Sequence, residues 1–132
     1  MSRLLFDTTF LIDAERAGDD LDDLIADDDD VAVAAVTLAE LRVGALLARG
    51  RRRDQRTAFV DEIAATVPVV SYDAEVAEEH ALLLVEVRRQ GRPRGAHDLI
   101  IAATAKAARR TVVTSDASAF DDLPEVDVRP HR

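Results

Sequence analysis

The first predicted strand is the feature that most limits what this chain can fold into. Leu4, Leu5 and Phe6 form a continuous apolar run without polar alternation, and Asp7 follows directly. A strand with no polar face is covered on both sides, which is typical of a central strand in a parallel sheet. Asp7 then stands at the carboxyl end of that strand. In open α/β sheets, ligands bind at this edge, near the point where the strand order reverses.

The rest of the chain extends the same architecture. Apolar runs predict further strands over residues 31–36, 67–70, 111–114 and 126–128. Helical patterns fall between them, over residues 8–16, 20–26, 37–48, 54–65, 73–89 and 96–109, with a helical turn over 118–122. Because helical segments join successive strands, the predicted fold class is α/β, with a central parallel five-stranded sheet and helices on both faces. No repeat or linker is visible, so residues 1–132 are expected to form one domain.

Composition limits the compartment and the partners. The chain has no cysteine, no signal-type segment and no apolar run long enough to span a bilayer, so we expect a cytoplasmic protein without membrane contact. The formal net charge of -9 repels nucleic acid from the molecule as a whole. The charge is uneven, however, since residues 19–30 contain eight Asp and residues 42–56 contain six Arg. Any contact with a polyanion must therefore be local, or bridged by cations.

Four acidic residues follow predicted strands or begin predicted helices: Asp7, Glu40, Asp98 and Asp116. Each alone has a local explanation as a helix cap or first-turn acid, and Thr37 with Glu40 matches a capping box. Together they differ, because parallel strands bring these positions to one edge. Two charges about 5 Å apart at an effective dielectric of 20 repel by roughly 3 kcal/mol. Converging carboxylates therefore indicate a site for a hard divalent cation, Mg²⁺ or Mn²⁺, which can activate water against a phosphodiester.

The segments around these acids resemble the successive motifs of PIN-domain nucleases. The matching segments are residues 4–13, 37–41, 98–105 and 114–116, with Phe120. In length and spacing the resemblance is closest to VapC-type toxins of bacterial toxin-antitoxin pairs. It implies a single PIN-like domain that is an Mg²⁺- or Mn²⁺-dependent endoribonuclease, dimeric in most members and held inactive by a cognate VapB-like antitoxin. It also implies that Asp7, Glu40 and Asp98 are the catalytic metal-binding acids and that Asp116 occupies the fourth polar position.

One position departs from the family pattern and leaves alternatives open. The family often has an acid before the phenylalanine that matches Phe120, whereas this chain has Ala119. A second metal site is then weak or absent, or Asp116 serves both roles. The alternative function is a catalytically weak PIN-fold module that only engages a protein or RNA partner. A receiver domain is disfavoured because the single lysine, Lys106, falls within a helix, and an aspartyl phosphatase is disfavoured because Thr9 stands where a second acid is needed.

Neighbouring polar residues have supporting assignments. Thr8, Thr114 and Ser115 are expected to orient ligands or water, although turn and capping roles explain them equally well. Arginines that offer contacts to RNA phosphates are Arg42, Arg49, Arg92 and Arg94. For the arginines between 42 and 56, a solvated helix face is the competing explanation. The sequence does not identify the RNA.

The resemblance also leads to an expectation about the antitoxin. An acidic pocket attracts arginine, so we expect the antitoxin to insert one near Asp7 and Asp98 while it covers apolar helix surface. The helices after Asp7 are expected to supply that surface. The groove residues predicted in this way are Phe10, Leu11, Leu21 and Leu24.

Overall fold

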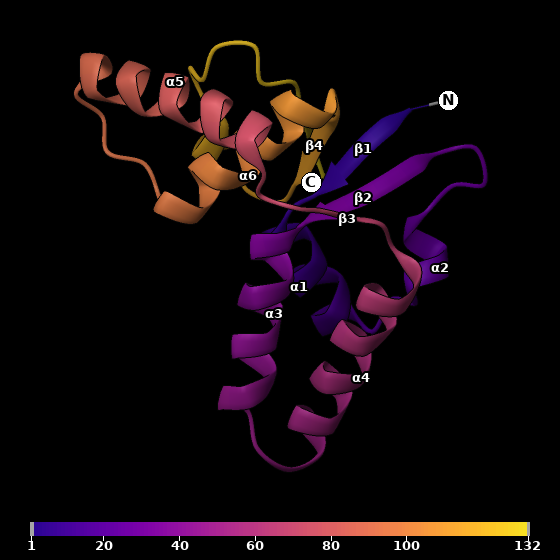
Figure 1. Ribbon diagram of the computed structural model, residues 1–132. Coiled ribbons are helices and arrows are strands. Elements are labelled where there is room, and N and C mark those ends of the chain that lie inside the picture. The colour runs from indigo at the N-terminus through magenta and orange to yellow at the C-terminus, as the bar shows by residue number, and fades with distance from the viewer. Residues whose placement is uncertain (1, 132) are drawn as a thin grey trace.

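The computed structural model describes residues 2–131 and contains one five-stranded sheet. The strands are β1 (Arg3–Phe6), β2 (Asp30–Ala34), β3 (Val69–Val70), β4 (Thr111–Thr114) and β5 (Val128–Pro130). Their order is β3-β2-β1-β4-β5, and every neighbouring pair is parallel. The predicted fold class is confirmed, as is the central position of β1, which pairs with β2 on one side and with β4 on the other (Figure 1).

The helices connect these strands in the predicted order. They are α1 (Thr8–Ala17), α2 (Leu21–Leu24), α3 (Ala35–Leu47), α4 (Gly50–Thr66), α5 (Ala74–Gln90), α6 (Ala96–Ala108) and the short 3₁₀ helix η1 (Ala117–Phe120). The α3 and α4 helices form an antiparallel hairpin that projects away from the sheet, whereas α5 packs against α6 at the other end of the molecule (Figure 1). No helix among residues 2–131 is both long and apolar enough to cross a membrane.

Both faces of the sheet are buried, as its apolar strands predict. Successive residues of a strand point to opposite faces. Leu4 and Phe6 therefore join one core with residues of α1, α2 and α4, while Leu5 joins a second core with residues of α5 and α6. Leu5 also pairs with Ala32 of β2 and Val112 of β4 in the sheet register. The sheet thus separates two hydrophobic cores, and its rigid centre holds the start of α1.

The strand order reverses between β1 and β4. From β1 the chain proceeds through β2 to β3 on one side, and it then returns to β4 and β5 on the other. Segments that leave adjacent strands in opposite directions open a crevice at their carboxyl ends. Asp7 follows β1 and Thr114 ends β4, so these two residues flank the crevice.

Several predicted boundaries are wrong. The strand predicted over residues 67–70 is only Val69–Val70, and the strand predicted over 126–128 is Val128–Pro130. Two further differences have identifiable reasons. The strand predicted over residues 31–36 ends at Ala34, because Val36 packs on the core from the first turn of α3 rather than from β2. The helix predicted from residue 54 begins at Gly50. Arginine is a good helix former, so the arginine run continues the helix instead of forming a loop. Gly50 itself has a φ of 60°, which lets the chain reverse between α3 and α4.

Candidate functional site

Asp7 lies at the centre of the crevice and is 2% exposed. It caps α1, since its Oδ1 accepts a hydrogen bond from the Phe10 backbone N–H at 2.9 Å. Thr9 Oγ1 lies 3.0 Å from the same oxygen. From the neighbouring strand, Thr114 Oγ1 donates to Asp7 Oδ2 at 2.5 Å. The carboxylate is thus fixed by the start of α1 and by the end of β4.

Burial raises the pKa of the Asp7 carboxyl above its ordinary value. The hydrogen bonds from Thr114, Phe10 and Thr9 act in the opposite direction because they stabilise the charged form. The negative charge of Asp116 adds to the rise. A buried carboxyl with a raised pKa and an acidic neighbour at a strand-end crevice is characteristic of a functional site.

Thr114 connects Asp7 to the segment that carries Asp116. The Thr114 hydroxyl donates to Asp7 and accepts from the Asp116 backbone N–H at 2.9 Å. The Asp116 side chain is exposed and accepts from Ser118 Oγ at 2.6 Å, and it does not cap η1. Ser115 lines a separate pocket of about 80 Å³ with Phe10 and His131.

Glu40 does not form the predicted capping box. Because α3 begins at Ala35, Thr37 and Glu40 both lie inside the helix, and no side chain caps its first turn. Thr8 of α1 instead donates to Glu40 Oε1 at 2.7 Å, with its Oγ1 also 3.2 Å from Thr37 Oγ1. His97 Nδ1 lies 3.1 Å from Glu40 Oε2. The two carboxylate oxygens of Glu40 are therefore held from α1 and from α6.

The carboxyl group of Asp98 is affected by the charges of the other three acids. Asp98 lies in the first turn of α6, where burial raises the pKa of its carboxyl. The charges of Asp7, Glu40 and Asp116 raise that pKa further, in this order of size. His97 has the opposite effect. Each of the other three acids therefore acts electrostatically on Asp98.

Gly95 lies directly before α6 and makes room for the Asp98 side chain. A Cβ atom at position 95 would lie 2.7 Å from Asp98 Oδ2. The Gly95 backbone, with φ -60° and ψ 134°, suits any residue, so the glycine is explained by this close approach and not by its conformation. Sequence reasoning missed both Gly95 and the contact of His97 with Glu40. Only their closeness to Asp98 in the chain could have suggested them.

The acids fit a hard divalent cation in donor chemistry, because all are carboxylates and they repel one another without a counter-charge. They are not gathered around one point, however. Within residues 2–131, no three Asp, Glu or His side chains form a group that could hold a metal ion. Thr8 and His97 hold the carboxylate of Glu40, and Thr9 and Thr114 hold that of Asp7.

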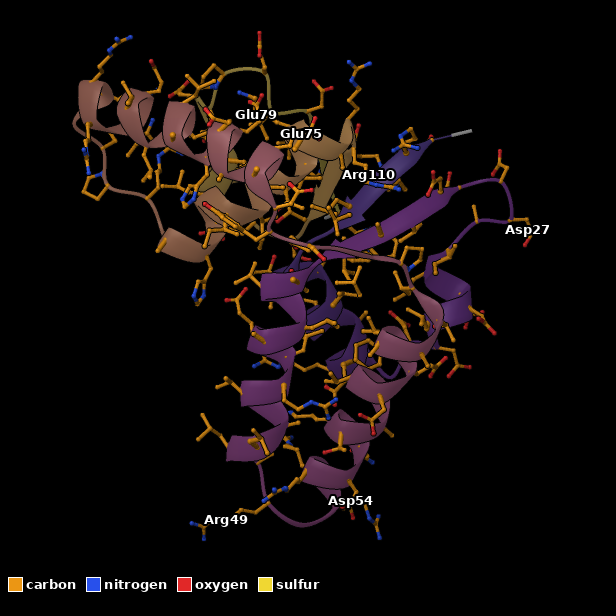
Figure 2. The ribbon with its side chains drawn as sticks, in the orientation of Figure 1. Asp27, Arg49, Asp54, Glu75, Glu79 and Arg110 are labelled. Carbon is orange, nitrogen blue, oxygen red and sulfur yellow. The ribbon has the colours of Figure 1, made fainter. Side chains whose placement is uncertain are left out.

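The four arginines predicted to bind RNA have different environments. Arg42 forms an ion pair with Asp61 at 2.7 Å, and Arg92 forms one with Asp122 at the same distance. Arg94 lies 3.4 Å from the Ala119 carbonyl oxygen and holds the loop before α6 against η1. Arg49 is exposed at the tip of the α3–α4 hairpin, where its side chain extends into solvent (Figure 2).

An apolar groove lies beside the acids, but three of the four groove residues predicted from the sequence are buried, and the fourth, Leu24, is half-buried and lines a separate pocket with Phe10. Phe10, Leu11 and Leu21 are each less than 5% exposed because they belong to the core beneath the sheet. A groove of about 130 Å³ lies instead between α1, α3 and α4. Its lining residues are Ile12, Glu15, Arg16, Glu40, Leu41, Gly44, Arg56, Phe59 and Val60. Glu40 connects this groove to the acidic crevice.

The fold and the crevice define a parallel α/β domain with acids at its switch point, and comparison with known proteins identifies its family. The sequence matches the PIN domain over residues 4–126, and the chain belongs to this family. Ribonuclease VapC5 of Mycobacterium tuberculosis is 37% identical over 126 residues, which cover 93% of this chain and 87% of the relative. Ribonuclease VapC2 of Rickettsia felis is 25% identical over 104 residues, covering 79% of this chain and 76% of the relative.

Solved structures agree with this assignment. VapBC-5 of Mycobacterium tuberculosis, a member of the VapBC family of toxin-antitoxin systems, has a TM-score of 0.80 at 31% identity and covers 99% of this chain and 100% of the matched chain. VapBC2 of Rickettsia felis, bound to a DNA fragment of its promoter, has a TM-score of 0.86 over 98% of this chain and 99% of the other. At 22% identity the second match supports the fold alone.

Proposed function

We propose that this chain is the endoribonuclease toxin of a toxin-antitoxin pair, cleaving RNA phosphodiesters in the cytoplasm at the crevice between β1 and β4. The observation that carries the proposal is the placement of four acids around the switch point of a PIN-family fold, with Asp98 under the influence of the other three charges. The relatives named as VapC ribonucleases support the same reaction class.

We propose Mg²⁺ or Mn²⁺ as the cofactor, held by Asp7, Glu40, Asp98 and Asp116. When bound, the ion would supply Lewis-acid chemistry that activates water and neutralises charge on the phosphodiester. The protein's part is to position the acids, since Asp7 is fixed by Thr9 and Thr114 and Glu40 by Thr8 and His97. Hydrogen bonds to both carboxylates set their orientation and limit the rearrangement that ion binding requires.

We propose a cognate VapB-like antitoxin as the inhibiting partner. The structural neighbours are toxin-antitoxin complexes, and the groove between α1, α3 and α4 leads to Glu40. Ile12 and Phe59 give that groove apolar surface, so an amphipathic segment placed there would block the crevice from its Glu40 side. A homodimer is part of the same proposal. Exposed apolar residues that support it are Val43, Leu46 and Leu47 on α3 and Leu82 and Val85 on α5.

Cleavage of purified tRNA and rRNA by wild type, Asp98→Asn and Asp28→Asn tests the reaction. Asp28 is an exposed acid outside the crevice, so its variant loses the same charge without touching the site. We expect cleavage that requires Mg²⁺ or Mn²⁺, a loss of at least about 100-fold for Asp98→Asn, and wild-type rates for Asp28→Asn. Equal cleavage by all three proteins would show that the crevice is not the active site. A wild-type protein that binds its antitoxin but cleaves no RNA would establish the binding module instead.

A further inference from the structure

The α3–α4 hairpin carries most of the molecule's concentrated positive charge. Residues 42–56 contain six arginines. Two of these are engaged within the hairpin, because Arg42 pairs with Asp61 and Arg56 donates to the Gly44 carbonyl oxygen at 3.2 Å. The other four are exposed, and none forms an ion pair within the part of the chain that the structure describes. These four are Arg49, Arg51, Arg52 and Arg53.

These arginines adjoin a polar groove that leads back toward the acids. The groove has a volume of about 330 Å³ and is lined by Glu15, Arg16, Arg52, Gln55 and Arg56. Arg16 and Arg56 also line the apolar groove that contains Glu40. A path therefore runs from Glu40, past Arg16 and Arg56, to Arg52 and the hairpin tip. We call the surface formed by Arg16, Arg52, Arg56 and the tip arginines Arg49, Arg51 and Arg53 the arginine groove.

We propose that the arginine groove binds the sugar-phosphate backbone of the RNA beside the cleaved bond. This inference rests on the proposed ribonuclease function. A polyanion is repelled by a molecule of net charge -9 except where arginines gather, and here they gather on the helix hairpin that also holds Glu40. Leu47, the last residue of α3, follows Glu40 by seven positions, about 10 Å along the helix axis, and Arg49 lies two residues beyond the end of that helix. The helical part of this span is roughly three nucleotides of a stacked strand at about 3.4 Å each.

The inference restricts both the class of RNA that can be the substrate and the set of arginines that bind it. Phosphate contacts position a strand without reading its sequence, so the substrate is an RNA that continues several nucleotides beyond the cleaved bond on the hairpin side. Arg42 and Arg92 are held in ion pairs, and Arg94 supports the loop before α6. The RNA contacts are therefore assigned to the arginine groove, and of the four arginines singled out in the sequence only Arg49 belongs to it.

RNA binding on an Asp98→Asn background tests the inference separately from cleavage. The probe is a fluorescein-labelled single-stranded RNA of 20 nucleotides, titrated at several salt concentrations. Arg52→Gln with Arg53→Gln should weaken binding at low salt at least about tenfold and reduce the salt slope by about 1.4, since each lost contact with a single strand contributes about 0.7. The matched control is Arg88→Gln with Arg109→Gln, which removes two exposed arginines of α5 and of the end of α6 that form no ion pair among the described residues, and it should change the slope little.

Two outcomes would overturn the inference. If the Arg52 and Arg53 variant binds RNA with the affinity and salt slope of the control, the inference is wrong while the ribonuclease function stands on the cleavage assay. If that variant binds RNA normally but loses the purified antitoxin, the surface is a protein docking site, which also overturns the inference. A second variant, Arg49→Gln with Arg51→Gln, should repeat the loss of RNA binding, and thermal melts should show both variants folded.

Discussion

Gly95 shows how a neighbouring side chain can limit which residue fits at a position. Alanine fits the Gly95 backbone, but its Cβ would lie 2.7 Å from Asp98 Oδ2 and displace that carboxylate. We expect Gly95→Ala to lower RNA cleavage at least about tenfold. Stability should not fall, because Asp98 can rotate away and replacing glycine restricts the unfolded chain, a gain of about 0.4–1 kcal/mol.

Cleavage rates and chemical denaturation of the same preparation measure the two effects. Gly44→Ala is the matched comparison for stability, since a Cβ there meets no atom within 4 Å and alanine in a helix gains about 1 kcal/mol over glycine. A Gly95→Ala protein that cleaves RNA at the wild-type rate would mean that Asp98 tolerates displacement.

Asp7 and Asp98 should respond in opposite ways to the loss of their charge. Asp98→Asn relieves a half-buried carboxylate repelled by three acids, so it should raise the melting temperature without metal. Asp7→Asn removes one acceptor from a carboxylate that receives Phe10 N–H and two threonine hydroxyls. It should lower stability by about 0.5–2 kcal/mol, the usual cost of losing a cap. The sequence indicates only charge repulsion at both acids, because the hydrogen bonds to Asp7 cannot be seen there.

The stabilisation by Asp98→Asn should depend on pH. The folded pKa of the Asp98 carboxyl is raised above its ordinary value of 3.8, so the folded protein binds more protons than the unfolded one between these two values. Wild-type stability from this group is therefore full below pH 3.8 and is lost as the pH rises through the folded pKa. In EDTA, the melting temperature of the variant should exceed that of wild type at pH 7, and the difference should shrink toward pH 3.5. An equal difference at both pH values would contradict the electrostatic cause.

At the scale of elements, Thr114 couples β4 to β1. Its buried hydroxyl donates to Asp7 and accepts the Asp116 N–H, so Thr114→Val removes one donor from the Asp7 carboxylate and the acceptor of the Asp116 N–H. We expect the free energy of unfolding to fall by about 1–3 kcal/mol and RNA cleavage to be reduced. Thr111→Val, at the half-buried amino end of the same strand, makes the same chemical change and should alter stability by less than about 0.5 kcal/mol. Urea denaturation measures the stability of both variants. Equal losses of stability would mean that Thr114 does not couple the two strands.

The strands and helices could be predicted from the sequence, but the contacts between them could not. Apolar runs identified β1 and β4 and the alternation of strands with helices, because burial on both faces leaves a local signature. The bracing of Glu40 by Thr8 and His97 has no such signature, since His97 lies 57 positions from Glu40 and the pairing exists only after α1, α3 and α6 pack together. Thr37 and Glu40 also showed why a local motif misleads. Their capping-box spacing occurs inside α3, where Thr8 replaces the backbone N–H as the partner of Glu40.

At the scale of the whole molecule, charge is divided between two regions. The four acids act on one another at the carboxyl end of the sheet, and four exposed arginines lie on the α3–α4 hairpin, which projects away from the sheet (Figure 1). An RNA that contacts the arginines meets a barrier of negative charge before it reaches the crevice. A divalent cation removes that barrier, so cleavage and ion binding should be coupled through the same acids.

Ion binding by the folded molecule should therefore appear as thermal stabilisation. A ligand that binds only the folded state adds about 2.7 kcal/mol at a hundred times its dissociation constant, which corresponds to a rise of roughly 10 °C for a domain of this size. We expect Mn²⁺ to raise the melting temperature of wild type by this order and that of Asp98→Asn far less. Asp28→Asn, with the same net charge as Asp98→Asn, should respond like wild type. If Mn²⁺ stabilised all three proteins equally, it would be acting on the acidic surface as a whole, and the crevice would not be its site.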